Sequence, residues 1–291
     1  MELSNLTLLN GEAFDESVLG AVTVPQQGDT SFQNAVLHDF DMVVLMLHSK
    51  QENEIVIRHT ISGELRTQTI YAALSGLERE VASGINTELI TGLLRGEIIW
   101  DPTGALEQLR RSMLHFDGAL RDRVLFLGFT RFLYMYVKSK SYMNAGCVMD
   151  AYNCILMALY HWARIEVGEA GHFPEPAVWE QVKHLNRSVH KLYEELTVST
   201  ETLEQRVQLV LLACEFAIMS KMSGCCALLL NILSGRREPW SAEELLRHPD
   251  LRAAEKELPL VLGKLASRSL VKELTSWSGA RAPGYNIRYT V

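Results

Sequence analysis

Short apolar runs bounded by polar residues dominate the first hundred positions of the sequence. Residues 40–47 form an apolar run of the kind that lies buried in a sheet. Helical periodicity appears at residues 76–93, and residues 1–16 read as an amphipathic helix or a loose arm. These patterns predict a small sheet with few helices. The predicted strands are residues 18–24, 40–47, 54–60, 65–71 and 97–101, the third and fourth forming a hairpin around Ser62-Gly63.

From about residue 104 to residue 235 the apolar positions recur with helical spacing almost throughout. Gly168 and Gly171, with two prolines just beyond, are a strong helix-stop signal. Ser199 or Thr200 is the expected N-cap of the last long helix. The pattern predicts a bundle of antiparallel helices. Its expected long members are residues 120–139, 144–167 and 179–196 and a helix from residue 203 past residue 222.

The last 56 residues change character again. Ser241-Ala242-Glu243-Glu244 is a capping box, and residues 258–269 predict a second helix with Pro259 in its first turn. Residues 270–274 and 285–289 predict a hairpin. Two helices followed by a two-stranded wing resemble a winged helix-turn-helix. The predicted fold class is therefore α+β, with a mixed-sheet domain over residues 1–118, a helical bundle over residues 119–235 and a winged-helix-like module over residues 236–291.

Charge is distributed unevenly over these three parts. The net charge of −7 divides into −10 for residues 1–118, zero for residues 119–235 and +3 for residues 236–291. An acidic first domain repels nucleic acid unless metal ions neutralise it, whereas the basic tail does not. We therefore expect weak DNA or protein contact, if any, through residues 236–291, and a homodimer is a further partner state that the sequence leaves open.

Cysteine usage and hydropathy indicate an intracellular protein. The five cysteines form no CxxC pair and lie in apolar helical stretches, so we expect buried free thiols rather than disulfides or a zinc site. No apolar run approaches the length of about 20 residues that spans a bilayer. The first residues carry acid where a signal peptide needs base. The expected location is the cytoplasm, with no membrane contact.

The strongest candidate for chemistry is the pair Asp39 and Asp41 at the start of the predicted central strand. Side chains alternate along a strand, so the two carboxylates would point the same way, where they repel each other unless a cation lies between them. Mg²⁺ binds one or two carboxylates together with substrate phosphates. The pair is thus a candidate metal site, with a vestigial site or a plain loop–strand junction as the other readings.

A polar stripe on the predicted helix 144–167 is the second candidate. At about 100° per residue, Asp150, Asn153, His161 and Arg164 fall on one narrow face. Such a face can bind a nucleotide or an acceptor, and His161 can act as a general base. A solvated face and a buried hydrogen-bonded ladder are the structural alternatives.

Other basic side chains could meet phosphate. Arg123 and Arg131 lie with Lys138 on one side of helix 120–139 and could bind a triphosphate. More often, a basic stripe of this kind is simply the solvent-exposed face of a helix. In the tail, the second helix is poor in base-reading residues, which favours a structural or docking role over sequence-specific DNA binding. The tail cations that could contact DNA phosphates are Lys264, Arg268, Lys272, Arg281 and Arg288.

Asp-x-Asp at the head of an apolar strand resembles the polymerase β-type nucleotidyltransferase fold. The chain as a whole is similar to an uncharacterised bacterial family called nucleotidyltransferase-like, and its layout also resembles aminoglycoside nucleotidyltransferases. The segments that carry the family resemblance are residues 150–153, 158–164, 179–183 and 191–196. The resemblance implies Mg²⁺ as cofactor and an NTP bound between the α/β domain and the bundle.

Three departures from the wider superfamily concern catalysis. Gly20-Ala21 stands where active members carry a Gly-Ser pair that holds the triphosphate. A polar loop replaces the helix between that pair and Asp-x-Asp. Residues 55–59 and 67–70 of the predicted hairpin supply no further carboxylate, and Glu54 and Glu64, at the strand ends, could substitute only in a favourable register. Two hypotheses follow. The first is a divergent nucleotidyltransferase that transfers a nucleoside monophosphate to an unknown acceptor; the second is a catalytically inactive nucleotide- or ligand-sensing regulator that acts through its winged helix.

Overall fold

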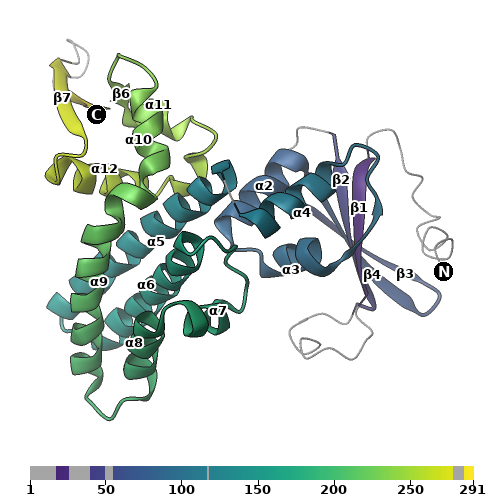
Figure 1. Ribbon diagram of the computed structural model, residues 1–291, viewed down its shortest axis with the longest axis horizontal. Helices are drawn as coiled ribbons and strands as arrows, with labels where there is room; N and C mark the ends of the chain where they lie inside the picture. Colours follow the sequence, from purple (N-terminus) through teal and green to yellow (C-terminus); the bar gives the residue numbers. More distant parts are fainter. Residues whose placement is uncertain (1–17, 26–39, 50–54, 117, 278–284) are drawn as a thin grey trace. The chain divides into compact units, whose positions relative to one another are not determined.

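The computed structural model describes residues 18–25, 40–49, 55–116, 118–277 and 285–291. The chain forms two compact units, residues 1–117 and residues 118–291 (Figure 1). The first is an α/β unit and the second is helical, with a small sheet near the C-terminus. The predicted α+β class is confirmed. The predicted arm over residues 1–16 lies outside the described residues.

A five-stranded mixed sheet in the order β3-β4-β2-β1-β5 organises the first unit. Among the described strands, β2 and β4 pair in parallel, in a register that sets Met42 beside Thr67, and the other neighbouring pairs are antiparallel. The hairpin of β3 and β4 forms as predicted, because Gly63 takes the left-handed conformation that its turn needs (φ 63°). The strands are β1 (Val18–Pro25), β2 (Met42–His48), β3 (Val56–Ser62), β4 (Leu65–Ala73) and β5 (Glu97–Trp100).

The described part of this unit also contains three helices: α2 (Leu74–Ser83), α3 (Thr87–Arg95) and α4 (Ala105–His115). The periodicity over residues 76–93 belongs to two helices, because Gly84 is left-handed (φ 66°) and Asn86 caps α3 through its side chain. Gly20 in β1 is a packing residue. A Cβ there would lie 2.5 Å from Leu106 Cδ1 of α4, so a larger residue at this position would force the Leu106 side chain to move.

Long helices α5 (Gly118–Asn144), α6 (Val148–Glu169) and α9 (Leu203–Cys225) form the bundle, with α7 (Val178–Leu185), α8 (Arg187–Val198) and α10 (Ala227–Ser234) beside them. Two boundary predictions are wrong. The expected helix 179–196 is broken at Asn186, whose side chain caps α8 by accepting from Ser188 and Val189 N–H groups. The N-cap of α9 is Thr202, in a capping box with Gln205, rather than Ser199 or Thr200.

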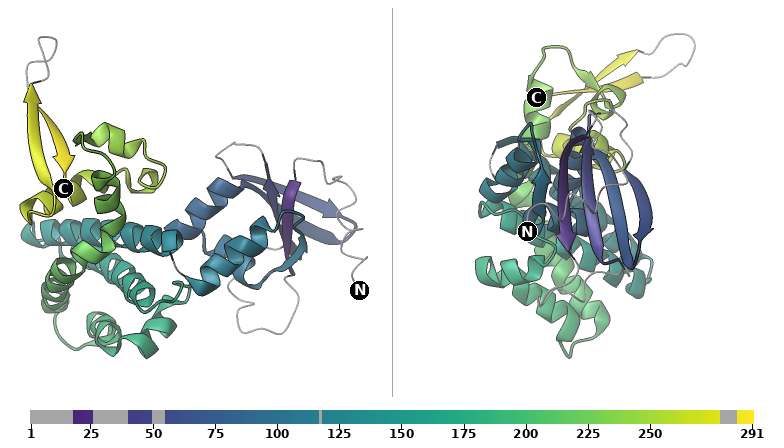
Figure 2. Two further views of the ribbon diagram at one scale, coloured as in Figure 1. Left: turned by 45° about the horizontal axis from the view of Figure 1, so that its top comes forward. Right: turned by 90° about the vertical axis from the view of Figure 1, so that its right-hand side faces the viewer.

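The C-terminal segment packs within the second unit. It contains α11 (Ala242–Leu246), the short 3₁₀ turn η2 (Arg252–Ala254), α12 (Leu258–Ser267), and a three-stranded sheet in the order β6-β8-β7. Figure 2 shows the two longer strands of this sheet in yellow. The Ser241 capping box and the hairpin of β7 (Lys272–Trp277) with β8 (Tyr285–Thr290) form as expected. The strand β6 (Trp240–Ser241), which pairs with β8, was not predicted.

One described helix, α9, is long and apolar enough to cross a membrane by length and composition alone. It packs against α5, α6 and α8, and its buried side includes Val207, Val210 and Cys214. We therefore interpret α9 as a bundle helix. All five cysteines are free as predicted, but burial holds only in part, because Cys147 is exposed and Cys154 half-buried.

Candidate functional site

Asp41 lies at a bend one residue before β2, at the junction where β2 and β4 begin to pair. Its Oδ2 accepts the Arg66 N–H at 2.7 Å, and its own N–H donates to the Arg66 carbonyl oxygen at 2.9 Å. These two bonds start the parallel ladder. The carboxylate thus has a structural partner in its own chain, which the sequence could not reveal. Asp39 lies outside the described residues.

The hairpin strands β3 and β4 carry basic and polar groups at the place where the nucleotidyltransferase resemblance implies a further metal-binding carboxylate. Neither β3 nor β4 contains Asp or Glu. Near Asp41, the Phe40 ring lies 4.6 Å from the His59 ring, and the Arg66 guanidinium lies 5.8 Å from the Phe40 ring centroid. No group of three or more His, Cys, Asp or Glu side chains that could hold a metal occurs among the described residues. These residues therefore do not by themselves form a protein-held Mg²⁺ site.

The predicted polar stripe on α6 divides into an exposed half and a buried half. Asp150 and Asn153 are exposed, as is Met157 between them and the rest of the stripe. His161 is 8% exposed and Arg164 is 4% exposed. The structure therefore separates the four stripe residues into a solvated pair near the start of α6 and a buried basic pair about two to three turns further along.

Arg164 is buried without a carboxylate partner among the described residues. Its Nη1 reaches the Pro174 carbonyl oxygen at a long 3.5 Å, and the nearby Tyr160 hydroxyl is its other polar contact. Burial lowers the pKa of the guanidinium, with Tyr160 opposing the shift. A cation in such a place is costly unless an anion neutralises it.

His161 lies beside that cation and also contains a polar atom whose hydrogen bonding is unsatisfied. Its Nδ1 is buried and has no hydrogen-bond partner. Burial, and then the charges of Arg131 on α5 and Arg164, lower its pKa to about 3. At neutral pH the ring is therefore uncharged and too weakly basic for the general-base role suggested by the sequence. Arg131, His161 and Arg164 constitute what we call the cationic cluster.

Close packing of α5 on α6 brings the cationic cluster together. A Cβ on Gly128 would lie 3.3 Å from Ile165 Cγ1, so the two helices approach each other at this glycine. One turn further along α5, Phe132 stacks on Trp162 with ring centroids 5.7 Å apart. These contacts hold Arg131 of α5 close enough to His161 for its charge to lower the pKa of the histidine. The spacing along either helix alone contained no signal for this meeting.

The other residues of the predicted basic stripe on α5 face different partners. Arg123 forms an ion pair with Asp250, its Nε lying 2.7 Å from Oδ1. Lys138 Nζ lies 5.7 Å from the Tyr134 ring centroid and 5.9 Å from that of Tyr142. Arg123 thus ties α5 to the C-terminal segment, and only Arg131 of the stripe joins the cationic cluster.

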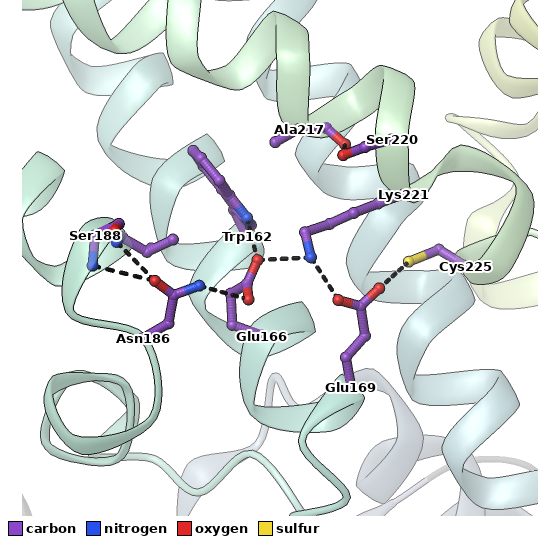
Figure 3. A network of polar contacts seen from close by, with 10 residues as sticks. Trp162, Glu166, Glu169, Asn186, Ser188, Ala217, Ser220, Lys221 and Cys225 are labelled. Atoms are coloured by element: carbon purple, nitrogen blue, oxygen red, sulfur yellow. Dashed lines mark hydrogen bonds and ion pairs between the residues drawn. The ribbon is translucent and has the colours of Figure 1, made fainter.

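Sequence reasoning missed a second charged cluster, at the C-terminal end of α6 (Figure 3). Lys221 Nζ lies 2.7 Å from Glu166 Oε1 and also pairs with Glu169. Glu166 further accepts from Trp162 Nε1 at 2.7 Å and from Asn186 Nδ2 at 2.8 Å. Burial alone would lower the pKa of Lys221, but hydrogen bonds and charges from the two glutamates outweigh it and raise that pKa. The sequence separates these residues too widely for periodicity to connect them.

A cavity of about 400 Å³ lies between α5, α9 and α12. Its lining combines apolar side chains such as Leu133 and Met222 with the cations Lys140, Lys264 and Arg268. It contains none of the residues predicted to bind a nucleotide. In the tail, Arg288 donates to the Pro239 carbonyl oxygen and lies 3.5 Å from Glu244, whereas Lys264, Arg268 and Lys272 are exposed. Arg281 lies outside the described residues.

Comparisons with known proteins agree with this two-part architecture. The nucleotidyltransferase-like family matches residues 5–121, and the YgxA-like substrate binding domain matches residues 123–221. The uncharacterised protein YgxA of Bacillus subtilis (strain 168) is 29% identical over 256 residues, which span 88% of this chain and 85% of that protein. A crystal structure of a nucleotidyltransferase-like protein from Exiguobacterium sibiricum 255-15 superposes with a TM-score of 0.83 at 25% identity, covering 100% of this chain and 99% of that one.

The boundary between the two family matches falls near residue 122, close to the division between the two compact units at residues 117 and 118. The full-length match to a solved nucleotidyltransferase-like protein extends the likeness over the C-terminal segment as well. The resemblance that the sequence indicated is therefore confirmed: residues 5–121 match the nucleotidyltransferase-like family, and the chain as a whole is similar to an uncharacterised bacterial protein and to a solved nucleotidyltransferase-like protein.

Proposed function

We propose that the protein binds a nucleotide through the cationic cluster and acts as a ligand-sensing protein in which transfer chemistry has been lost. The observation that supports this most strongly is Arg164, a buried guanidinium with no carboxylate partner among the described residues. Phosphate is the biological anion that guanidinium groups bind best, because its oxygens accept two parallel hydrogen bonds. The substrate-binding description of the family that matches residues 123–221 supports placing the ligand in the helical unit.

The state of the remaining site residues favours sensing over catalysis. Asp41 already accepts a backbone hydrogen bond, the neighbouring strands offer no further carboxylate, and His161 has a pKa of about 3. A nucleotidyl transfer needs cations at the phosphates and a base near the acceptor. The chain retains cationic groups suited to holding phosphate but has lost an obvious base.

The signal would pass to residues 236–291, whose order of strand, helices and hairpin fits the winged-helix-like module expected from the sequence. The helix α5 carries Arg131, which acts on His161, and two turns earlier Arg123, which is paired with Asp250 of the C-terminal segment. A ligand that draws Arg131 toward its phosphate would therefore shift α5, which contacts residues 236–291 through the Arg123–Asp250 ion pair. A DNA or protein partner in the cytoplasm would then bind residues 236–291 more strongly or more weakly.

Mg²⁺-dependent transfer from an NTP is the second candidate. The position of Asp41 at the start of the central strand favours it, since that is where the polymerase β-type fold places its metal-binding carboxylates. Asp41 Oδ1 together with the phosphates of an NTP would be the ligands available to the ion.

Titration calorimetry of ATP and GTP, with and without Mg²⁺, separates these functions. We expect binding without Mg²⁺ in the wild type, a loss of about 30-fold in affinity in Arg164→Met, and little change in Asp41→Asn. Lys191→Met, a change at an exposed α8 cation, is the matched control. Binding that requires both Mg²⁺ and Asp41, or release of pyrophosphate by the wild type alone, would replace sensing with transfer. Binding unaffected by Arg164→Met would refute the cationic cluster as the site.

A further inference from the structure

The cavity of about 400 Å³ between α5, α9 and α12 is separate from the cationic cluster, because none of the three residues of that cluster lines it. Its volume falls within the range of about 300–1,000 Å³ that is typical of small-molecule sites. The helices α5 and α9 belong to the bundle, whereas α12 belongs to residues 236–291. A ligand in this cavity would therefore contact both parts of the second unit.

One part of the lining is aliphatic. Leu133, Ile218 and Met222 are 0%, 4% and 3% exposed, and the half-buried Leu260 of α12 joins them. We call these four residues the aliphatic wall. Tyr136 supplies the one aromatic ring among the described lining residues. A planar nucleotide base usually stacks on aromatic side chains, whereas adaptable aliphatic and methionine side chains pack well around a hydrocarbon chain. The aliphatic wall therefore favours an alkyl group over a second nucleotide.

The described lining residues also include three cations and one carboxylate, and the carboxylate already has partners. Glu215 Oε2 accepts from the Tyr136 hydroxyl at 3.1 Å and lies 3.5 Å from Lys140 Nζ. Burial raises the pKa of the Tyr136 hydroxyl, which therefore stays protonated and donates at neutral pH. The side chains of Lys264 and Arg268, one helical turn apart, have no hydrogen-bond or ion-pair partner among the described residues. Two positive charges at this cavity are thus available to an anion.

Polar and apolar lining residues are segregated along the helices. Along α5 the lining changes from Leu133 to Lys140, and along α9 it changes from Glu215 to Met222. The ion pair between Glu215 and Lys140 brings the polar parts of these two helices together. On α12, Leu260 precedes the two cations. A molecule that matches this lining has an anionic head at one end and an apolar chain at the other.

We propose that this cavity binds a medium-chain alkyl anion, with its carboxylate or phosphate head at Lys264 and Arg268 and its chain against the aliphatic wall. The guanidinium of Arg268 can bind either head group through two parallel hydrogen bonds. The lining part of α9, from Glu215 to Met222, spans about 10 Å at about 1.5 Å per residue. An extended chain advances about 1.2 Å per bond, so this length fits a chain of about eight carbons.

Stabilisation of the α12 dipole is the alternative role for the two cations. Lys264 lies in the last turn of α12 and Arg268 is its C-cap, where basic side chains interact favourably with the helix dipole. That role does not require an aliphatic cavity beside the charges. It also predicts that the protein has no preference for an anion that carries an alkyl chain, which binding measurements can decide.

Titration calorimetry of the full chain with octanoate, octyl phosphate, octanol and acetate is the first test. At least one octyl anion should bind about 10-fold more tightly than octanol, and acetate should not bind, because both the head and the chain contribute. Whichever octyl anion binds more tightly specifies the head group. The same affinity should be measured in Arg164→Met, which removes the nucleotide site proposed above but no cavity residue. Equal affinity for octanol, or no binding of either octyl anion, would overturn the proposal.

Variants of the lining place the ligand in the cavity. Arg268→Gln should weaken binding of the octyl anion about 10-fold, whereas Arg252→Gln, a change at an exposed arginine of η2 that does not line the cavity, should leave it unchanged. Val137→Trp should fill the cavity and abolish binding. Thermal melts check that the variants fold. Equal affinities in Arg268→Gln and Arg252→Gln, or binding that survives Val137→Trp, would refute the site. Binding to phosphatidylglycerol vesicles without binding of either octyl anion would overturn the proposal in favour of a membrane surface.

Discussion

Two charged clusters lie along the second half of α6. Among the described residues, one of them contains a buried cation with carboxylate partners, Lys221, and the other contains a buried cation without one, Arg164. Around Lys221, two glutamates, an indole N–H and an amide N–H leave every buried charge with a partner (Figure 3). A few residues earlier, Arg164 has one long hydrogen bond to a carbonyl oxygen and the Tyr160 hydroxyl, and His161 Nδ1 has no hydrogen-bond partner. The C-terminal half of α6 therefore pairs with a cation that serves the fold, Lys221 of α9, and itself contains a cation, Arg164, whose cost the fold does not offset.

This difference distinguishes structural from functional charge. A buried ion pair with complete hydrogen bonding contributes to folding as it stands, so removing one member exposes the cost of the other. A buried cation without a counterion destabilises the fold, and a group of that kind is retained where a ligand completes it. The contrast predicts opposite responses to removing the two cations.

The largest effect is expected from Lys221→Met. It would leave Glu166, whose side chain is 13% exposed, as a buried charge without its cation, and unfolding free energy should fall by about 3 kcal/mol. Urea denaturation measures this, with Lys191→Met as the exposed control. A loss below about 1 kcal/mol would mean that the Lys221 cluster is as incomplete as the cationic cluster.

The next effect is a pH dependence that belongs to His161. Its pKa of about 3 in the folded state lies below the ordinary value of 6.5, so the unfolded chain takes up the proton first as pH falls. Stability from this group is complete above pH 6.5 and is lost progressively toward pH 3, by about 3 kcal/mol at pH 4. In His161→Gln the difference between urea unfolding at pH 7 and at pH 4 should shrink by that amount; an unchanged difference would assign the acid sensitivity to other groups.

Arg164→Met should have the smaller and opposite stability effect. Because the guanidinium is buried without a counterion, unfolding free energy should stay constant or rise by about 1 kcal/mol, while ATP affinity falls by about 2 kcal/mol. Thermal melts with and without ATP measure both quantities. If stability drops as it does in Lys221→Met, Arg164 is a structural residue with a partner of its own.

The smallest effect is expected at Asp41. Asp41→Asn keeps an oxygen that can accept the Arg66 N–H, so stability should change by less than about 0.5 kcal/mol, whereas Asp41→Ala should cost about 1 kcal/mol. Urea denaturation of these two variants measures what the hydrogen bond from the Arg66 N–H to Asp41 contributes to the free energy of unfolding. Equal losses in both variants would show that the charge of Asp41, rather than its hydrogen bond, matters to the first unit.

The sequence predicted the elements well and their junctions poorly. Strands and long helices follow from periodicity, which burial of one face imposes. The breaks at Gly84 and Asn186 and the cap at Thr202 depend on local hydrogen bonds, and several residues near each could have supplied them. The strand β6, two residues long, has no periodicity to detect.

The candidate site was predictable only as separate stripes. Periodicity placed His161 and Arg164 on one face of α6 and Arg131 on α5, but it could not say that Gly128 lets these helices meet there, nor that Asp150 and Asn153 remain exposed. It could not foresee the Arg66 amide as the partner of Asp41, because pairing of β2 with β4 is set by the tertiary fold. Contacts between elements carry this information, and one sequence alone does not.

The most direct test of the cationic cluster is to measure the pKa of His161 by NMR of its ring while tripolyphosphate or ATP is added. The variant His161→Gln identifies the signal, because the signal is absent from its spectrum. Burial and then the charges of Arg131 and Arg164 depress this pKa, and an anion bound beside the two arginines would offset the contribution of their charges. We predict that the pKa rises from about 3 by at least one unit as the ligand saturates. A pKa that stays near 3 while the ligand binds would place the ligand elsewhere and contradict the account.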